Sequence, residues 1–273
     1  MAVTHAIKKT STIKKAVKWL DKNRDPMFSL LFQFTCRTGF RITDATEIEW
    51  SNFDFDENTL TIEENKGTRG NKARARLKVL QEWHKRLFFL EKGNEEFKEK
   101  LFLTKPKDLF NVLPEKYLSL VNPEIDAAIS KAKVKCRTVD IPKELMIKFR
   151  QRKHKYSKID DGFVFSKRTL KSNRARGWHC EDESVKPVVT RQSCLAAFKK
   201  MQDALDVLGE KVRSCCHGAR KIFARRLFET NGKDLNIVMQ TMGWSDVTMV
   251  MRYLGFDDEN RKEASANANA NWF

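Results

Sequence analysis

Apolar residues recur along most of this chain with the three-to-four-residue spacing of amphipathic helices. Ile13, Val17 and Leu20 share one helical face, and the segment MFSLLFQF from residue 27 is apolar nearly all round, which predicts a central buried helix. Further helices are expected at 77–90, at KELMIKFRQRKHK, and in four stretches between residues 190 and 254.

The ends of two early helices are marked by residues with defined capping preferences. Asp25, followed by a proline, is expected to cap the buried helix, and Gly39 to end it. Thr43 or Asp44 can cap the next helix, which is expected to run to about Trp50. Arg41 is therefore expected in a tight corner between two helices, where the backbone holds its charge in place.

Short stretches of alternating apolar and polar residues predict a small sheet. Leu60 and Ile62 alternate in one strand, Val139 and Ile141 in another, and DGFVFSKR is expected as a further short strand. The predicted fold class is therefore α+β, mainly α-helical, with a small antiparallel β-sheet.

Residues 67–132 separate the first two of these strands and are interpreted as an insertion in a β-hairpin. The segment contains the helix expected at 77–90 and many lysines and arginines, although KARARLKV could itself form a strand. Four aromatic residues could give the insertion a small core: Trp83, Phe88, Phe89 and Phe102. From residue 167 to residue 186 the polar sequence predicts a loop.

The composition favours a nucleic-acid partner. Lysines and arginines outnumber acidic residues 53 to 36 in 273 residues, a net charge of +17, and such a surplus suits a polyanion. An anionic membrane would attract the same charge, but no stretch approaches the roughly 18 apolar residues of a spanning helix, and the N-terminus lacks the apolar core of a signal peptide. We therefore expect a soluble intracellular protein without a membrane partner.

The six cysteines show no paired spacing and are expected to be reduced thiols. A zinc site built from His179, Cys180 and Cys194 is conceivable, but zinc sites usually have closely paired ligands. We therefore expect no bound metal.

One constellation of polar residues carries candidate chemistry. His217 and Arg220 are three residues apart, so on a helix they project from the same face. Taken alone, this pair could be structural, Trp244 an ordinary packing residue, and Tyr253 a residue at the rim of the core. A tyrosine among cations in a basic chain can, however, act as a nucleophile toward a phosphate.

Three motifs give this constellation a specific interpretation. TGFRITDATEIEW around Arg41 resembles the first arginine motif of tyrosine recombinases, HGAR resembles their H-x-x-R motif, and MGWSDVTMVMRYLGF resembles the motif that contains their tyrosine, here Tyr253. The resemblance covers residues from about 12 to 256. Trp244 stands where most members have histidine, and the pattern around the acidic position departs from the commoner residues at Asp44.

The resemblance implies a role for each residue. Tyr253 would attack the scissile phosphodiester and form a 3′-phosphotyrosyl link, while Arg41 and Arg220 would hold the non-bridging oxygens, for which the guanidinium fork is suited. His217 would assist proton transfer, and Trp244 would donate a hydrogen bond to the phosphate. The resemblance implies no cofactor and no metal, because the arginines stabilise the developing charge.

The family's general acid is a lysine in the β-hairpin. Lys66 follows the first predicted strand at a family-like distance from Arg41 and is preferred here. Lys133 and Lys135, which precede the second strand, remain open as alternatives, and all three lysines could serve only to contact the DNA backbone.

The same resemblance divides the chain into a basic N-terminal arm at 1–10, a catalytic domain at 11–256 and a flexible tail at 257–273. The N-terminal core-binding domain of full-length members is expected to be absent. The arm and the insertion would then supply its DNA contacts, unless the insertion is a solvated decoration. Trp272 and Phe273 could anchor the tail on a neighbouring protomer.

The expected function is site-specific recombination of double-stranded DNA: integration, excision or inversion of phage or mobile-element DNA in the cytoplasm of a bacterial, archaeal or phage-infected cell. A homo-oligomer on DNA, from dimer to tetramer, is expected, and an accessory DNA-binding protein is a further candidate partner. A type IB topoisomerase or telomere resolvase, and a catalytically silent DNA-binding regulator, are the alternatives. The DNA site itself cannot be deduced from the sequence.

Overall fold

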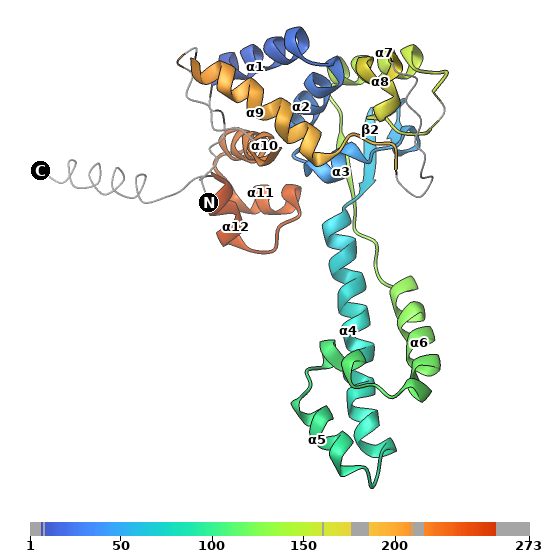
Figure 1. Ribbon diagram of the computed structural model, residues 1–273. Helices are drawn as coiled ribbons and strands as arrows, with labels where there is room; N and C mark the ends of the chain where they lie inside the picture. The colour runs from blue at the N-terminus through green and yellow to red at the C-terminus, as the bar shows by residue number, and fades with distance from the viewer. Residues whose placement is uncertain are drawn as a thin grey trace, which may run out of the picture. The chain divides into compact units, whose positions relative to one another are not determined.

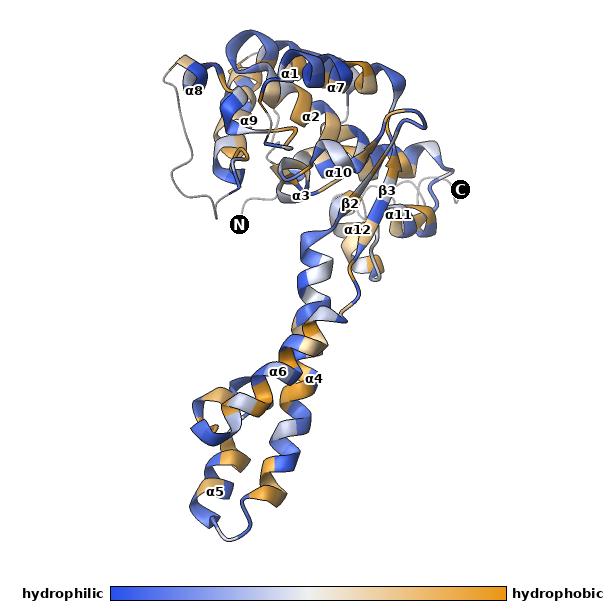
Figure 2. Ribbon diagram, turned by 90° about the vertical axis from the view of Figure 1, so that its right-hand side faces the viewer, coloured by the Kyte–Doolittle hydropathy of each residue, from blue (hydrophilic) through white to orange (hydrophobic). Residues whose placement is uncertain are grey.

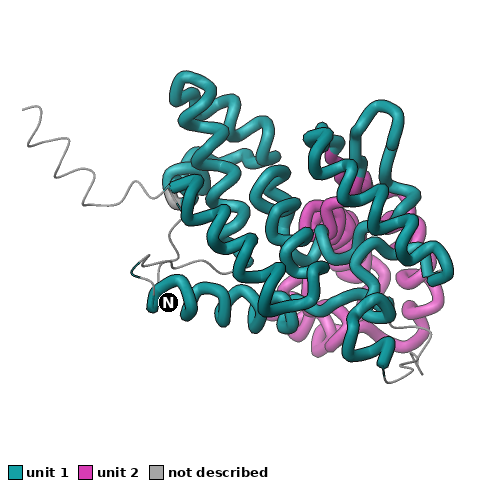
Figure 3. The backbone as a smooth tube through the Cα atoms, turned by 90° about the horizontal axis from the view of Figure 1, so that it is seen from above, with its two compact units in different colours: residues 1–61, 138–273 teal, residues 62–137 magenta. Residues whose placement is uncertain are grey.

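The computed structural model describes residues 7, 9–159, 161–175, 186–207, 209 and 216–254. The chain divides into two compact units (Figure 3): unit 1 comprises the residues up to 61 and from 138 onward, and unit 2 comprises residues 62–137. Several segments discussed above lie outside the described residues: most of the arm at 1–10, His179, Cys180, and the tail at 257–273 with Trp272 and Phe273.

Unit 1 is built mainly of helices around a small sheet (Figure 1). Its α-helices are α1 (Thr10–Asn23), α2 (Pro26–Thr38), α3 (Ile42–Thr46), α7 (Lys143–Lys155), α8 (Lys171–Ala175), α9 (Arg191–Val207), α10 (Cys216–Thr230), α11 (Leu235–Met242) and α12 (Val247–Leu254), with 3-10 turns η1 (Trp50–Asn52) and η4 (Lys167–Thr169). The strands are β1 (Phe53–Asp54), β2 (Thr59–Glu63) and β3 (Cys136–Asp140), in the order β1-β2-β3.

The sheet joins segments that are far apart in the sequence. The amide of Ile141 donates a hydrogen bond to the carbonyl of Asn58 at 2.8 Å, and the hydroxyls of Thr61 and Thr138 lie 2.7 Å apart. Because the partner number falls as the strand advances, β3 runs antiparallel to β2. The predicted class, mainly helical with a small antiparallel sheet, is confirmed.

Helix α2 is the centre of unit 1 and is capped as predicted. Asp25 accepts a hydrogen bond from the amide of Met27 at 3.0 Å, a proline follows at the first helical position, and Gly39 ends the helix with φ 65°. The helix packs against α1, α3, α7 and α10, and Phe32 and Phe34 are fully buried on different sides of it. This packing explains why its sequence is apolar nearly all round.

One detail of the predicted helices is wrong. Helix α3 begins directly after Arg41 and ends at residue 46, so neither Thr43 nor Asp44 caps it, and the turn η1 follows near residue 50. On α1, Leu20 is buried together with Thr12 and Ala16, whereas Ile13 and Val17 are half-buried.

The segment DGFVFSKR does not form the predicted strand. It makes single β-bridges, Glu49 with Phe163 and Ser166 with Val188. The polar stretch predicted as a loop starts instead with η4 and α8, where the side chain of Ser166 accepts the amide hydrogen of Arg168 and caps the turn.

Unit 2 consists of α4 (Asn65–Leu90), α5 (Glu95–Leu103), η2 (Pro106–Asn111), η3 (Glu115–Tyr117) and α6 (Leu118–Ser130). Helix α4 starts well before the predicted 77, and KARARLKV lies inside it, so the alternative of a strand there is wrong. Figure 2 shows that α4 is hydrophilic where it leaves β2 and becomes apolar only further along.

The core of unit 2 is formed on one face of α4. Leu80, Trp83 and Leu87 lie at i, i+3 and i+7 and are 2%, 4% and 0% exposed. They pack with buried residues of the other elements: Phe97, Leu101, Leu109, Leu113, Val121 and Ile125. Phe88, Phe89 and Phe102 are 37%, 73% and 77% exposed. Their predicted place in this core is therefore wrong, whereas that of Trp83 is right.

Candidate active site

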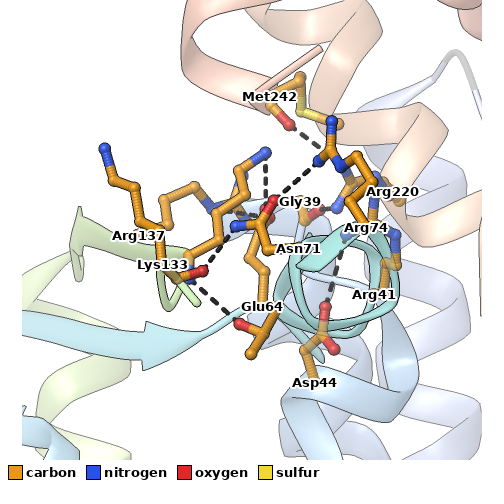
Figure 4. A network of polar contacts seen from close by, with 12 residues as sticks. Gly39, Arg41, Asp44, Glu64, Asn71, Arg74, Lys133, Arg137, Arg220 and Met242 are labelled. Carbon is orange, nitrogen blue, oxygen red and sulfur yellow. Dashed lines mark hydrogen bonds and ion pairs between the residues drawn. The ribbon is translucent and has the colours of Figure 1, made fainter. Parts of the chain in front are cut away.

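Arg220 is the most deeply buried of the predicted site residues, at 1% exposure. It lies in the first turns of α10, three residues after His217. Its Nη1 donates to the carbonyl of Gly39 at 2.5 Å and its Nη2 to the carbonyl of Met242 at 3.2 Å (Figure 4). The guanidinium is thus fixed between the end of α2 and the end of α11, as a buried cation must be to offset its desolvation.

Gly39 makes this arrangement possible in two ways. Its positive φ allows the chain to turn out of α2 and present its carbonyl to Arg220. A Cβ at this position would also collide with the ring of Phe223 and lie 3.1 Å from the sulfur of Met242. A glycine is therefore required both by the backbone conformation and by the close approach of α10 and α11.

The rings of Trp244 and Tyr253 are in contact with each other, and Trp244 lies beside Arg220. Their ring centroids are 4.5 Å apart, and the guanidinium carbon of Arg220 lies 5.4 Å from the indole centroid. Trp244 is 8% exposed, and its Nε1 is buried without a hydrogen-bond acceptor in the described part of the chain. A buried donor without an acceptor costs free energy.

The turn between α11 and α12 sets the position of Tyr253. Gly243 ends α11 with φ 64°, and Asp246 accepts hydrogen bonds from both the amide and the hydroxyl of Thr248 at 2.8 and 2.5 Å. These bonds cap the start of α12. Tyr253 lies two turns later, is partly exposed, and packs beside the cluster that contains Val250 and Leu254.

Arg41 lies at the start of α3 and is partly exposed. Its Nη1 is 3.7 Å from Oδ2 of Asp44, whose side chain is fully buried (Figure 4). Asp44 therefore orients Arg41 from within the same short helix. This is a positioning role, in place of the capping role that the sequence suggested.

His217 connects these parts electrostatically. The pKa of its imidazole lies below the ordinary value of 6.5, first because the surrounding protein partly desolvates the ring, and then because Arg191, Arg220, Arg41 and Lys221 repel a positive charge on it. The two predicted arginines and the predicted histidine are therefore close enough to interact, and the lowered pKa favours the neutral form of the ring.

Two cations near this site were not singled out from the sequence. Arg191 is the first residue of α9, where a positive charge is unfavourable to the helix dipole, and this local mismatch was an available signal. Lys221 is 9% exposed and its Nζ lies 5.9 Å from the ring centroid of Tyr253. A lysine beside the arginine of the H-x-x-R motif, followed by apolar residues, was a weaker signal.

The lysine candidates lie in unit 2. Lys66 is exposed in the first turn of α4, directly after β2, rather than in a tight hairpin turn. Lys135 is engaged with the buried carboxylate of Glu64, with its Nζ 3.2 Å from Oε2, whereas the carbonyl of Lys133 accepts a hydrogen bond from Asn71 at 2.6 Å (Figure 4). Of these three lysines, Lys135 is the one whose ammonium forms an ion pair with a described residue.

Within the described ranges, no group of three or more His, Cys, Asp and Glu side chains is arranged to hold a metal ion. Cys36 and Cys194 are buried thiols, and burial raises the pKa of each. None of the described helices is both long enough and apolar enough to cross a bilayer.

The helical unit with its small sheet, the early arginine, the H-x-x-R pair and the late tyrosine define a tyrosine recombinase catalytic domain. A family model described as the phage integrase family matches residues 9–260, and the chain belongs to this family. Among curated proteins, no sequence matches the chain.

Three solved structures illustrate what the chain is similar to. The chain is 12% identical to XerA recombinase, with a TM-score of 0.52 over 98% of this chain and 65% of that one. It is 13% identical to XerH site-specific recombinase bound to palindromic difH substrate, with a TM-score of 0.49 over 97% of this chain and 53% of that one. It is 14% identical to the catalytic domain of bacteriophage HP1 integrase, with a TM-score of 0.44 over 96% and 94%. The chain thus spans between about half and two-thirds of the two Xer recombinases.

Proposed function

We propose that this protein is a site-specific DNA recombinase that breaks and rejoins double-stranded DNA through Tyr253. The observation that carries the proposal is the assembly of Arg41, His217, Arg220, Trp244 and Tyr253 from three separate parts of the chain around one buried guanidinium. Membership of the phage integrase family supports the same reaction class.

The phosphate would be held by Arg41, Arg220 and Trp244. Arg220 is prevented from moving by two backbone carbonyls, and Arg41 is oriented by Asp44, so both are organised before the substrate binds. The buried Nε1 of Trp244 would gain in a phosphate oxygen the acceptor that it lacks among the described residues. These donors would stabilise the negative charge that grows on the phosphorane.

The covalent step would proceed by in-line displacement. The phenolic oxygen of Tyr253 attacks phosphorus, the bond from phosphorus to the 5′-oxygen breaks, and the phenolic proton passes to the neutral imidazole of His217. The leaving 5′-oxygen takes a proton from a general acid, for which we propose Lys66. The reverse attack by another 5′-hydroxyl rejoins the strand, and because the ester keeps the bond energy no nucleotide cofactor is consumed.

We further propose that the enzyme works as a homo-oligomer on DNA in the cytoplasm, because exchange between two duplexes requires more than one tyrosine. The surplus of 17 positive charges supports a DNA partner. Whether the reaction is integration, excision or inversion depends on the DNA sites, and an accessory protein could set that direction.

The proposal is tested with nicked suicide duplexes, in which the nick traps the covalent intermediate. Their sequences are taken from the ends of the mobile element or from the surrounding genome. Wild-type protein is expected to form a covalent adduct that survives denaturing electrophoresis, and Tyr253→Phe to bind the same DNA without forming one. Absence of an adduct with every duplex, despite tight binding, would favour a silent regulator. Relaxation of plasmids that lack any specific site would instead favour a type IB topoisomerase.

A further inference from the structure

The charges of unit 2 are segregated along its sequence. Residues 65–78 contain six lysines and arginines, residues 131–137 contain four, and neither segment contains an aspartate or glutamate. Between them, residues 79–130 carry eight cations and nine acidic residues. The net positive charge of the unit therefore comes from these two segments, which we call the basic stem.

The two segments of the basic stem lie side by side. The amide of Lys135 donates to the hydroxyl of Thr68 at 3.1 Å, and the side chain of Asn71 donates to the carbonyl of Lys133 at 2.6 Å (Figure 4). Gly67 permits this contact, because a Cβ there would lie 3.0 Å from Cβ and 2.5 Å from Cδ of Lys135. Ten cations are thus gathered around the first turns of one helix.

One face of the stem is left uncovered by this contact. Arg69, Lys72 and Arg76 follow one another at i, i+3 and i+7 on α4 and are all exposed. Asn71 and Thr68, which bind the returning segment, lie on a different face. Arg69 and Arg76 are separated by about 10 Å along the helix axis at about 1.5 Å per residue, which corresponds to about three phosphates of one strand at about 3.4 Å each.

The helix is poorly supported at this end. Between residues 65 and 79 only Thr68 is buried, two glycines interrupt the segment, and like charges face each other at i, i+3 and i+4. The acidic residues that normally stabilise a first turn are lacking in α4. A polyanion along the exposed face would remove this repulsion.

The chemistry of the stem favours nucleic acid over a protein partner. Neither stem segment contains an aromatic residue, although aromatic side chains supply most hot spots of protein interfaces. The exposed side chains are long cations suited to phosphate oxygens. Sequence-independent contacts of this kind account for most non-specific binding to DNA.

We propose that the exposed face of the basic stem, with Arg69, Lys72 and Arg76, binds the phosphate backbone of duplex DNA at phosphates other than the scissile one. This surface is additional to the phosphate-binding residues of unit 1. The inference rests on the proposed function for its partner, duplex DNA, but requires no catalysis.

The test compares two triple variants of the full chain that lose the same charge. R69Q/K72Q/R76Q neutralises the stem face, and K85Q/K92Q/K107Q neutralises three exposed lysines in the rest of unit 2. Glutamine keeps most of the side-chain length and is about as good a helix former as lysine. Binding to a 40-base-pair duplex of arbitrary sequence is measured by fluorescence anisotropy over a range of KCl concentrations.

In the stem variant, the slope of log K against log salt concentration is expected to be smaller by about 2.7, because each of three lost phosphate contacts contributes about 0.9. Its affinity near physiological salt is expected to fall on the order of 100-fold. The control variant is expected to lose less than one contact. A charge-conserving variant, R69K/R76K, should keep the wild-type slope, which would show that the positive charge at these positions, and not the arginine side chain itself, carries the contacts.

Equal slopes for the stem and control variants would overturn the proposal. If wild-type protein still forms the Tyr253 adduct in that case, the proposed function stands and only the stem is refuted. If the salt slope of the stem variant falls as expected while no duplex yields an adduct, the proposal for DNA binding by the stem is supported and the proposed recombinase reaction is refuted.

Discussion

Arg220 and Gly39 are 181 residues apart in sequence, yet the guanidinium of one donates directly to the backbone carbonyl of the other. The bond joins the two motifs that carry the arginines, because Gly39 stands two residues before Arg41. The glycine of the first motif therefore serves the arginine of the second.

This relationship predicts a large effect of Gly39→Ala. Left-handed backbone strain costs about 1–2 kcal/mol, and the collision with Phe223 should add about 1–3 kcal/mol. Urea denaturation measures the loss of unfolding free energy. The matched control is Gly162→Ala, since Gly162 has φ 74° but open space where a Cβ would lie. Equal losses in the two variants would show that the close approach to Phe223 is unimportant.

Trp244 offers a test of the phosphate contact. Trp244→Phe removes the buried N–H and should reduce the rate of adduct formation by about 10- to 150-fold, equivalent to about 1.5–3 kcal/mol for a hydrogen bond to a charged group. Trp244→His restores a ring N–H donor and should recover part of the rate. Single-turnover cleavage of a nicked duplex measures both. Equally slow variants would argue that the ring packs on Tyr253 and donates nothing.

His217 should make stability depend on pH. The folded state binds fewer protons at this ring than the unfolded chain, because its pKa lies below the ordinary value of 6.5. The contribution of His217 to the free energy of unfolding is therefore fully present above about pH 6.5, the ordinary pKa of the ring. It is lost as the pH falls through the pKa that His217 has in the folded protein. Denaturation of wild-type protein and His217→Gln between pH 5 and pH 8 should show a flatter profile for the variant.

The cause of that pKa can be tested separately. Arg191→Gln removes a cation that acts on His217 and should raise the pKa of the imidazole toward 6.5, as measured by NMR titration of its ring protons. Arg225→Gln is a suitable control. Arg225 lies on α10, the helix that contains His217, but pairs there with Glu229. An unchanged pKa in Arg191→Gln would show that Arg191 does not contribute to the lowered pKa of His217.

The two glycines of α4 should respond differently to alanine. Gly70 has open space around the position of a Cβ, so Gly70→Ala is expected to stabilise the helix by about 0.5–1 kcal/mol. Gly67→Ala should gain less or lose stability, because the new methyl group meets the side chain of Lys135. Hydrogen exchange of the amides at 66–78 measures both changes. A greater gain in Gly67→Ala would contradict the packing described for the basic stem.

The sequence was most informative where local chemistry alone decides the structure. Asp25 and Gly39 define the ends of α2 through capping preferences that need no tertiary contact. The order of Arg41, His217, Arg220 and Tyr253 was sufficient to indicate the family, although the role of each side chain remains a prediction.

The sequence was less informative where distant contacts override local preference. The first turns of α4 contain two glycines, which are poor helix formers, and two hydrogen bonds with the returning chain help to hold these turns: Asn71 donates one to Lys133, and Thr68 accepts one from Lys135. Phe88 and Phe89 are apolar but lie off the face that Trp83 and Leu87 bury. Hydrophobicity alone therefore gave a wrong core, and the i, i+3, i+7 spacing would have given the right one.

The neighbouring strands β2 and β3 have a consequence for how this chain can be rebuilt. Unit 2 begins and ends where these strands meet, beside the paired hydroxyls of Thr61 and Thr138. A segment whose two ends are adjacent can be exchanged for a short turn without stretching the remaining chain. Residues 62–137 can in this sense be exchanged for a segment of another length, provided that the replacement keeps the lysine that we propose as general acid, Lys66.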